Sequence, residues 1–454
     1  MSPDAPIMRT PSRNCLRHFQ RPLLVLCLFT LTLAPRKSLA WGEPHGAITQ
    51  AALEVLPSWQ KEILGDELAP MAGYYCTIPD LVQNSSLLRD KGDAKFAMMA
   101  SQPGKVYLLK LHLPSAEQPE NLETLRYFIS QSVTALKAGK VGDAARFMGT
   151  ICHLIEDFGS PAHTMPGDNM FTLLQQFMPP SEKMQGRLLH SPIESGTFKV
   201  DLHGYQPGLL GLTVEEASWR LLHRVHEGII NARSTTFPII QALYADDGAA
   251  MLAGQMKAAT MDARILADAL HTILCLGADK FNDAGQEALR TAGIAAYWPL
   301  EAVNLYYPQA HFFSAPNWGH AHSGVVLEGG TKAVPLRLRI QGKDGTVEKE
   351  FANGISTGMG KPLTYLLPKD VYPRFTVLAG LQSGLGEKGR VEFTILGDGK
   401  ALATAIVSGS DPAHLFDCDI TGVTQLQLAA TSRGPDPKSN YAIWAEPVLM
   451  KKLW

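Results

Sequence analysis

The chain lacks a strong excess of charge, a cluster of cysteines and, after residue 40, any long apolar run. Its formal net charge of −2 gives no long-range attraction to polyanions, so composition neither requires nor excludes nucleic acid. None of its six cysteines belongs to a CxxC pair, which argues against a thiolate zinc site. The remaining composition is that of an ordinary globular protein, and 454 residues exceed what one hydrophobic core usually supports, so we expect two domains.

The first forty residues differ from the rest. Four arginines within Arg9–Arg21 precede the apolar run Pro22–Ala34, and Ser38-Leu39-Ala40 then supplies small residues suited to a cleavage site. This pattern predicts a signal peptide over 1–40, a mature chain that starts at Trp41, and a secreted or periplasmic or cell-surface protein. The alternative is an uncleaved membrane anchor. One disulfide could form among the cysteines that remain, although none is required: Cys76, Cys152, Cys275 and Cys418.

Hydrophobic periodicity divides the mature chain in two. From residue 46 to about 280 apolar residues recur at helical spacing, notably over 119–139, 142–158, 213–232 and 247–278, which predicts an all-α, bundle-like domain over 41–300. After a linker at 301–315, short alternating runs separated by Gly and Asp turns predict an all-β sandwich over 316–454. The predicted fold class is therefore multidomain, with helices first and strands second.

Two His–acid pairs in the helical part have metal-ligand spacing. His153 and Asp157 are four residues apart and so share one helix face, and His190 and Glu194 repeat that spacing. His163 follows the expected end of the first helix near Gly159-Ser-Pro161, where it can turn back toward Asp157. Imidazole and carboxylate are preferred zinc ligands, although one such pair alone is more often a surface ion pair.

The predicted mature terminus adds a further donor group. Trp41-Gly-Glu-Pro-His45 places a free α-amino group and an imidazole together at the start of a helix. Because an α-amino group has a pKa of about 7.7 to 8, zinc can displace its proton at neutral pH.

In this ordered set of motifs, the chain resembles the superfamily of zinc-dependent phospholipases C and secreted three-zinc nucleases over roughly 41–280. The resemblance implies about three zinc ions. One would be held by Trp41, His45 and Asp157, with Asp157 bridging to a second ion that takes His153, and the third would be held by His163, His190 and Glu194. For the remaining ligands of the second ion, Asp80 and His112 are the best matches, with Asp90 and Asp93 as substitutes because the interval from Asp80 to His112 is long for the family.

The resemblance implies hydrolysis of a phosphate ester. We expect in-line attack on phosphorus by a zinc-bound hydroxide, with Asp80 either a ligand or the catalytic base that orients the water. Glu194 favours the phospholipase C branch, since the nucleases usually have Asp there, and no basic run grips a polyanion. Phosphatidylcholine-preferring relatives carry an aromatic residue just after the metal Asp, where this chain has Leu81, so the headgroup stays open.

The last third, from Val377-Leu-Ala-Gly-Leu-Gln382 through Gly389–Phe393, Leu396–Lys400 and Asp419–Gly422 to Tyr441–Trp444, resembles the novel carbohydrate-binding module family. That likeness implies a jelly-roll-like module that could bind glycan. Trp444 could offer a sugar-binding face, but a Trp within a strand is more often core.

The other histidines have no matching motif. We interpret them as structural, surface or linker residues rather than ligands: His203, His223, His226 and His271 in the helical part, and His311, His320 and His322 in the join between domains.

Two alternatives stay open. A single-strand nuclease or nucleotidase of the same superfamily would use nearly the same metal cage, with nucleic acid as its substrate. A noncatalytic, glycan-binding cell-surface protein would keep the cage only as a structural zinc site, and turnover rather than metal content would distinguish it.

Overall fold

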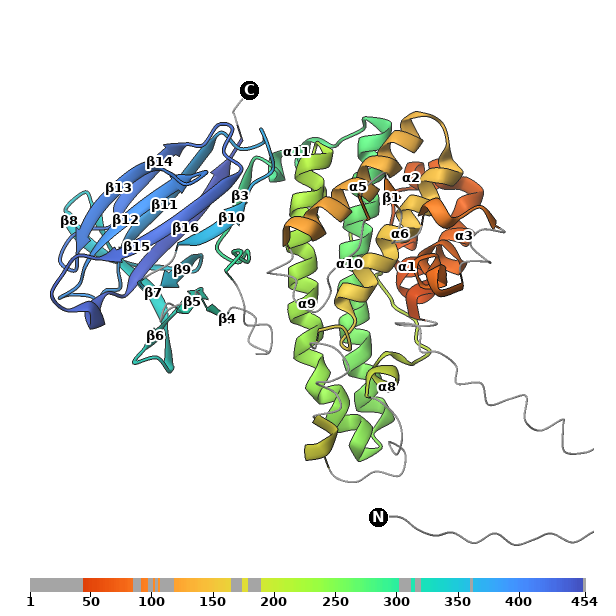
Figure 1. Cartoon of the computed structure of the whole chain (residues 1–454), viewed down its shortest axis with the longest axis horizontal. Helices are drawn as coiled ribbons and strands as arrows, with labels where there is room; N and C mark the ends of the chain where they lie inside the picture. The colour runs from red at the N-terminus through yellow and green to blue at the C-terminus, as the bar shows by residue number, and fades with distance from the viewer. Residues whose placement is uncertain are drawn as a thin grey trace, which may run out of the picture. The chain divides into compact units, whose positions relative to one another are not determined.

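The computed structural model describes residues 44–84, 91–96, 101–102, 105–106, 118–164, 174–178, 189–301, 312–314, 320–359 and 362–451. Helices occupy its first part and strands its second, so the predicted fold class is confirmed (Figure 1). No helix in the described ranges is both long and apolar enough to cross a membrane.

The helical part is built around α6 (Val141–Gly159). Every residue of α6 from Phe147 to Gly159 is buried, which is the pattern of a helix enclosed on all sides. The helices that accompany it are α1 (Pro44–Glu54), α2 (Ser58–Leu64), α3 (Leu68–Gly73), α5 (Gln118–Lys137), α8 (His190–Glu194), α9 (Val214–Ala245), α10 (Gly248–Ala278) and α11 (Asp283–Ala288). The predicted helical stretches are thus confirmed, and α6 holds the His153–Asp157 pair at the centre of the bundle.

The longest helices, α9 and α10, run side by side (Figure 1). Asp246 ends α9 in the left-handed conformation, and the Asp247 side chain accepts a hydrogen bond from Ala250 N at 2.9 Å to begin α10. The sequence predicted α9 only to residue 232, yet the helix continues past Pro238. Pro238 lacks a backbone donor, but Ile239 and Ile240 directly after it are buried in a separate apolar cluster with Ala162, Leu189 and Ile193, which offsets the lost hydrogen bond.

Short segments connect these helices and carry functional side chains. The 3-10 segment η3 (Pro79–Asn84) holds Asp80, and it follows η2 (Tyr75–Thr77), which packs on α6. The described 3-10 turns also include η1 (Gly65–Glu67), η4 (Ala94–Phe96) and η6 (Pro437–Ser439), and β1 (Ser101–Gln102) pairs with β2 (Lys105–Val106).

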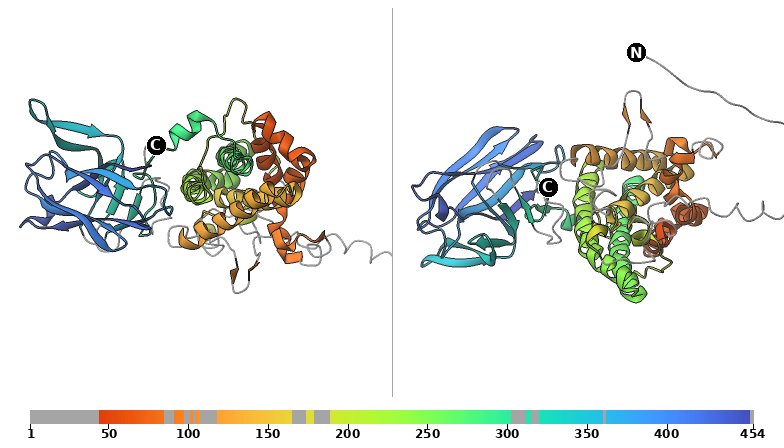
Figure 2. Two further views of the ribbon diagram at one scale, coloured as in Figure 1. Left: turned by 90° about the horizontal axis from the view of Figure 1, so that it is seen from above. Right: turned by 60° about the horizontal axis from the view of Figure 1, so that its bottom comes forward.

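The β region contains two facing sheets (Figure 2). One has the order β10-β15-β12-β13, and the other has β14-β11-β16-β9-β5-β4 with β3 also paired to β16. Between them the Trp444 ring meets Phe393 edge to face at 5.0 Å. The strands are β3 (Thr291–Gly293), β4 (Phe312–Ser314), β5 (His320–Ser323), β9 (Gly354–Thr357), β10 (Leu363–Leu366), β11 (Arg374–Leu381), β12 (Arg390–Gly397), β13 (Lys400–Ser408), β14 (His414–Asp419), β15 (Gln425–Ser432) and β16 (Ala442–Met450).

A third, smaller sheet, β6 (Val325–Glu328), β7 (Lys332–Gly342) and β8 (Gly345–Phe351), encloses a separate apolar cluster with Ile443 and Ala445 of β16. This cluster lies apart from the core between the two facing sheets, because alternate residues of β16 point to opposite faces.

Two sequence predictions about the join need correction. Strand β3 lies before the expected boundary at residue 300, and β4 lies inside the expected linker, because both pair with strands distant in the sequence. His320 and His322 belong to β5 and so are sheet residues rather than linker residues, and His311 lies outside the described residues. The remaining division of the chain at residues 300 and 316 stays a prediction.

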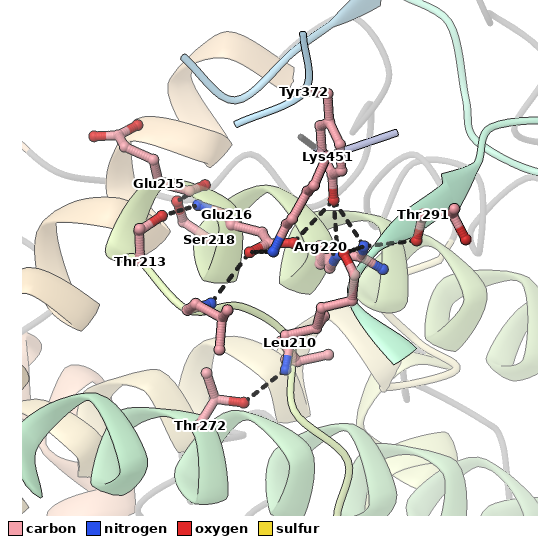
Figure 3. Close-up of polar contacts among 12 residues, drawn as sticks. Leu210, Thr213, Glu215, Glu216, Ser218, Arg220, Thr272, Thr291, Tyr372 and Lys451 are labelled. Carbon is pink, nitrogen blue, oxygen red and sulfur yellow. Dashed lines mark hydrogen bonds and ion pairs between the residues drawn. The ribbon is translucent and has the colours of Figure 1, made fainter. Parts of the chain in front are cut away.

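A buried polar network joins α9 to residues of the β region (Figure 3). Glu216 Oε1 accepts hydrogen bonds from Tyr372 Oη at 2.9 Å and Arg220 Nε at 3.1 Å, while Lys451 Nζ lies 2.6 Å from Glu216 Oε2. The Trp219 indole donates to Leu366 O at 2.7 Å. Each charge is thus paired, which is the condition for keeping Glu216 buried.

Candidate metal centre

The first group of potential ligands converges on the second half of α6. His153 Nε2 lies 3.3 Å from Asp157 Oδ2 and 3.5 Å from Asp80 Oδ1 of η3. His45, from the first turn of α1, brings its Nε2 to 3.9 Å from Asp157 Oδ1. One ligand atom each from His45, His153 and Asp157 lie within 4.8 Å of one another, a group that could hold a metal ion. The predicted helical pair therefore shares its face with a residue from α1, more than a hundred positions away.

Contacts behind the imidazoles orient them. His45 Nδ1 lies 2.6 Å from Glu156 Oε2, and Thr49 Oγ1 donates to Glu156 Oε1 at 2.6 Å. His153 Nδ1 donates to Cys76 O at 2.8 Å. With Nδ1 engaged, each ring presents Nε2 to Asp157, and a carboxylate or carbonyl on the far nitrogen is the usual support for a metal-binding histidine.

A second group lies just beyond the end of α6. His163 Nε2 is 2.9 Å and His190 Nε2 is 3.2 Å from the same oxygen, Glu194 Oε1. Ser160, the C-cap of α6, donates its hydroxyl to that oxygen at 3.0 Å and so links the two groups. His163 reaches this position because the chain turns directly after α6, with His163 N bonded to Ser160 O at 3.0 Å. His163, His190 and Glu194 form the second group that could hold a metal ion.

The electrostatics of both groups suit a cation. Burial lowers the pKa of His153, but neighbouring Asp157 outweighs it and raises this pKa to about 9. Burial raises the pKa of Asp157, yet His153 and His163 hold it well below the ordinary value. The pKa of Glu194 is likewise lowered, against its burial, by His163 and His190. In the metal-free protein, protonated imidazoles thus supply the positive charge that the buried carboxylates need.

Several buried atoms in the centre have no hydrogen-bond partner among the residues that the structure describes, namely His45 Nε2, Asp80 Oδ2, Asp157 Oδ1 and Glu194 Oε2. Leaving such atoms unsatisfied costs about 1–3 kcal/mol each, more when they are charged. They are nitrogen and oxygen donors that zinc accepts, and a bound cation would satisfy them. The residues present therefore fit zinc.

The structure brings together most, but not all, of the predicted site residues. His45, Asp80, His153, Asp157, His163, His190 and Glu194 gather in the two groups or beside them. Trp41, His112 and Asp90 lie outside the described residues, so their roles stay predictions. Asp93 belongs to neither group, and Arg146 Nε at 3.0 Å and Tyr74 Oη at 2.9 Å hold its carboxylate.

Glu156 is the residue that sequence reasoning missed. Its carboxylate is fully buried and contacts two side chains of α1. The only signal in the sequence was its place beside Asp157, since adjacent helix positions point about 100° apart and so face different partners. A buried acid next to a predicted ligand was a candidate for supporting a ligand on another helix.

The remaining histidines of the helical part lie outside both groups, as expected. His223 stacks on Tyr297 at 3.8 Å, His226 stacks on Trp298 at 4.4 Å, His271 contacts Gln60, and His203 is exposed. The four cysteines that the structure describes are free and buried. Trp444 is fully buried, which confirms its assignment to the core.

Comparison with known proteins identifies the last third of the chain. Residues 310–450 match the family model "NPCBM/NEW2 domain". The C-terminal part is an NPCBM domain. No curated protein matches the chain.

Solved structures that resemble parts of the chain have low identity. The CBM51-2 and INT domains of Clostridium perfringens ZmpB, in complex with GlcNAc, are 19% identical with a TM-score of 0.26, covering 30% of this chain and 28% of that one. CBM51 of Clostridium perfringens GH95, in complex with methyl-galactose, is 16% identical with a TM-score of 0.29, covering 35% and 99%. Clostridium perfringens alpha-toxin is 11% identical with a TM-score of 0.28, covering 89% of this chain and 86% of the toxin. Because identities and TM-scores this low carry no functional argument, function is inferred from the side chains of the metal centre.

Proposed function

We propose that the chain is a secreted, zinc-dependent phosphodiester hydrolase, and specifically a phospholipase C. The observation that carries this proposal is the pair of adjacent nitrogen–oxygen cages at the end of α6. In these cages several buried atoms have no hydrogen-bond partner within the described ranges, and the pKa values of Asp157 and Glu194 are lowered despite burial. Arrays of this kind, with ions close together, are used for phosphoryl chemistry, where developing negative charge on oxygen must be stabilised.

Zinc in these cages would lower the pKa of a bound water and polarise the phosphoryl oxygens. About three ions are proposed. The first would take His45 and Asp157 together with the amino and carbonyl groups of Trp41, and the second His153, Asp157, Asp80 and His112. The third would be held by His163, His190 and Glu194.

Asp80 is the proposed catalytic residue. It contributes one oxygen near His153, and its second, buried oxygen has no hydrogen-bond partner in the described part of the chain. Burial raises the pKa of Asp80, against the lowering effect of His153 and His45. A carboxylate placed in this way can hold or accept a proton from the water that attacks phosphorus.

A lipid phosphodiester is the proposed substrate. Glu194 at the end of the last motif favours the phospholipase branch, and a net charge of −2 offers no general attraction to nucleic acid. Leu81 packs its side chain against the core, so no aromatic ring at this position selects a choline headgroup. A single-strand nuclease or nucleotidase is the second candidate, because it would use nearly the same cage.

The NPCBM domain supports a glycan partner, which would hold the enzyme at a glycosylated surface. An NPCBM domain also fits a protein that is secreted after signal-peptide cleavage before Trp41. We propose that the enzyme acts outside the cell. A noncatalytic glycan-binding protein with a structural zinc cage is the contrasting possibility.

The test is product analysis. Zinc-loaded protein that begins with Trp41 is incubated with mixed phospholipid vesicles and, separately, with single-stranded DNA, and the products are identified by mass spectrometry. Diacylglycerol with a phosphorylated headgroup is expected. Nucleotides would place the protein in the nuclease branch, and absence of product from both would favour the noncatalytic protein.

A further inference from the structure

The β region contains a cavity of about 250 Å³ that the proposed chemistry of the helical region does not use. It lies where the face of the larger sheet formed by β5, β9 and β16 meets the β6–β7 hairpin, and the turn before β16 closes it on another side. His322 of β5 and Ser356 of β9 are direct cross-strand partners and line the wall that belongs to the sheet. The cavity is thus built from three separate chain segments.

Its walls combine polar groups with one aromatic ring. His322, Ser356 and Asn440 are each more than nine-tenths buried, while Tyr441 is half-buried and packs partly on the apolar cluster beneath the hairpin. Recognition of a sugar needs this combination, because ring hydroxyls require hydrogen-bonding groups and the C–H face of the ring packs on an aromatic side chain. Trp444 cannot serve this purpose because it is fully buried between the sheets.

The wall is fixed by hydrogen bonds. Asn440 donates to Ser432 Oγ at 2.7 Å and accepts from Arg390 N at 3.0 Å, and the Ser356 hydroxyl donates to Val325 O at 2.7 Å. The turn that carries Lys438 is held by Asp436, whose carboxylate accepts from Lys438 N at 3.2 Å and Ser439 Oγ at 2.8 Å. A preformed wall reduces the entropy that a small ligand loses on binding.

The volume of the cavity and the charged groups around it limit the kinds of ligand that can bind. Sites for drug-sized ligands measure about 300–1,000 Å³, so a cavity slightly below that range suits a single sugar ring. Lys438 is exposed, and no carboxylate lines the cavity among the described residues. A neutral sugar would therefore meet no repulsion, whereas a protonated amino sugar would meet the like charge of Lys438 with no carboxylate in the described lining to offset it.

We propose that this cavity is a binding site for one neutral sugar ring, with Tyr441 packing on the ring and Lys438 at its edge. The inference rests on the proposed glycan-binding role of the NPCBM domain and gives that role a location and a selectivity. It does not depend on the chemistry of the metal centre.

The experiment uses the full mature chain. Binding of N-acetylglucosamine, galactose and glucosamine is measured by isothermal titration at about pH 6, where an amine of this type carries a proton. We expect saturable binding of a neutral sugar, about fivefold weaker binding of glucosamine, as for an exposed charge contact, and loss of binding in Tyr441→Ala. Lys438→Glu should reverse the preference toward glucosamine, and Lys343→Glu, in the exposed β7–β8 turn, is the matched control.

Thermal unfolding confirms that each variant is folded, and Lys438→Glu keeps the test decisive if Tyr441→Ala is unstable. Lack of saturable binding by the wild-type chain, or unchanged binding in both variants, overturns the proposed site. Phospholipid hydrolysis is measured on the same samples and should be equal in wild type and the control Lys343→Glu. If no sample hydrolyses phospholipid while sugar binding follows Lys438 and Tyr441, the enzyme proposal fails and the sugar site stands.

Discussion

The helical region and the β region differ in how many acidic and basic side chains they bury. Among the described residues, the β region from residue 291 onward buries no acidic or basic side chain apart from one histidine, His322. Within the ranges that the structure describes, the helical region buries six histidines and eight other acidic or basic side chains: Asp93, Glu156, Asp157, Glu194, Glu216, Arg233, Asp262 and Asp268. Burial of a charge is costly unless it is paired or bound to metal, so charges concentrate where a function or a junction requires them. The described part of the β region is thus a framework with few buried charges, whereas the helical region holds both groups that could bind a metal ion.

The largest expected effect comes from Asp157, which touches both His45 and His153. Asp157→Asn should remove the two metal sites that share this carboxylate and reduce hydrolysis below detection, because an amide neither bridges two ions nor balances their charge. Metal content by mass spectrometry of the intact protein and turnover on phospholipid measure both effects. Asp201→Asn, at an exposed position, is the control, and wild-type zinc content in Asp157→Asn would rule out the bridging role.

The second-largest effect is expected from Glu156, although this residue is not a proposed metal ligand. Glu156→Gln keeps the shape of the side chain but weakens its hold on His45 Nδ1, which lies 2.6 Å away. Loss of such a supporting contact costs about 10–100-fold in metal affinity or activity. Zinc affinity measured by competition with a chelator gives a readout that a change in stability alone would not produce.

Glu54→Gln is the matched control for that experiment, because Glu54 is an exposed acid on the same helix as His45. Equal zinc affinity in Glu156→Gln and Glu54→Gln would show that buried charge in the helical region does not orient the cage.

Gly159 tests how tightly the buried acids are packed. A Cβ at this position would lie 1.6 Å from Asp262 Oδ1, so Gly159→Ala should destabilise the protein by about 1–3 kcal/mol through overpacking. Denaturant unfolding measures the change. Gly248→Ala introduces a Cβ with no atom within 4 Å and should be neutral or stabilising. Similar stability of the two variants would mean that the end of α6 can shift away from Asp262.

The smallest expected effect is on pH dependence. Because the pKa of His153 is raised from 6.5 to about 9 in the metal-free fold, its contribution to stability is present below about pH 6.5 and lost as pH rises through 9. Zinc-free protein should therefore lose a few degrees of melting temperature over this interval, roughly 2–4 °C per kcal/mol. Zinc-loaded protein should not, since the metal already displaces the proton. A flat profile for the zinc-free protein would contradict the charge balance described for α6.

Much of the site could be predicted because its spacing is local. Four-residue intervals place His153 with Asp157 and His190 with Glu194 on shared helix faces, and both pairs are formed. The contact of Glu156 with His45 and Thr49 could not be predicted in this way, because it spans more than a hundred residues and depends on how α1 packs on α6.

The difference between local patterns and long-range contacts also explains which parts of the fold could be predicted. Helical periodicity located α5, α6 and α10 closely, since each is long and repeats apolar residues at helical spacing. Strands β3 and β4 were missed because a three-residue strand carries almost no pattern of its own and is defined by its partner, β16 or β5. Pro238 similarly obscured the continuation of α9, which depends on tertiary packing.

We propose that the buried acids and histidines on α6 and just beyond its end form a zinc-dependent hydrolytic centre. The most direct test is to titrate zinc into metal-free protein that begins with Trp41, while counting bound ions and measuring phospholipid hydrolysis on the same sample. The account predicts that activity appears only as the cages fill and reaches its plateau at about three ions per chain. Full hydrolysis by protein shown to contain no metal, or three bound zinc ions without any turnover, would contradict it.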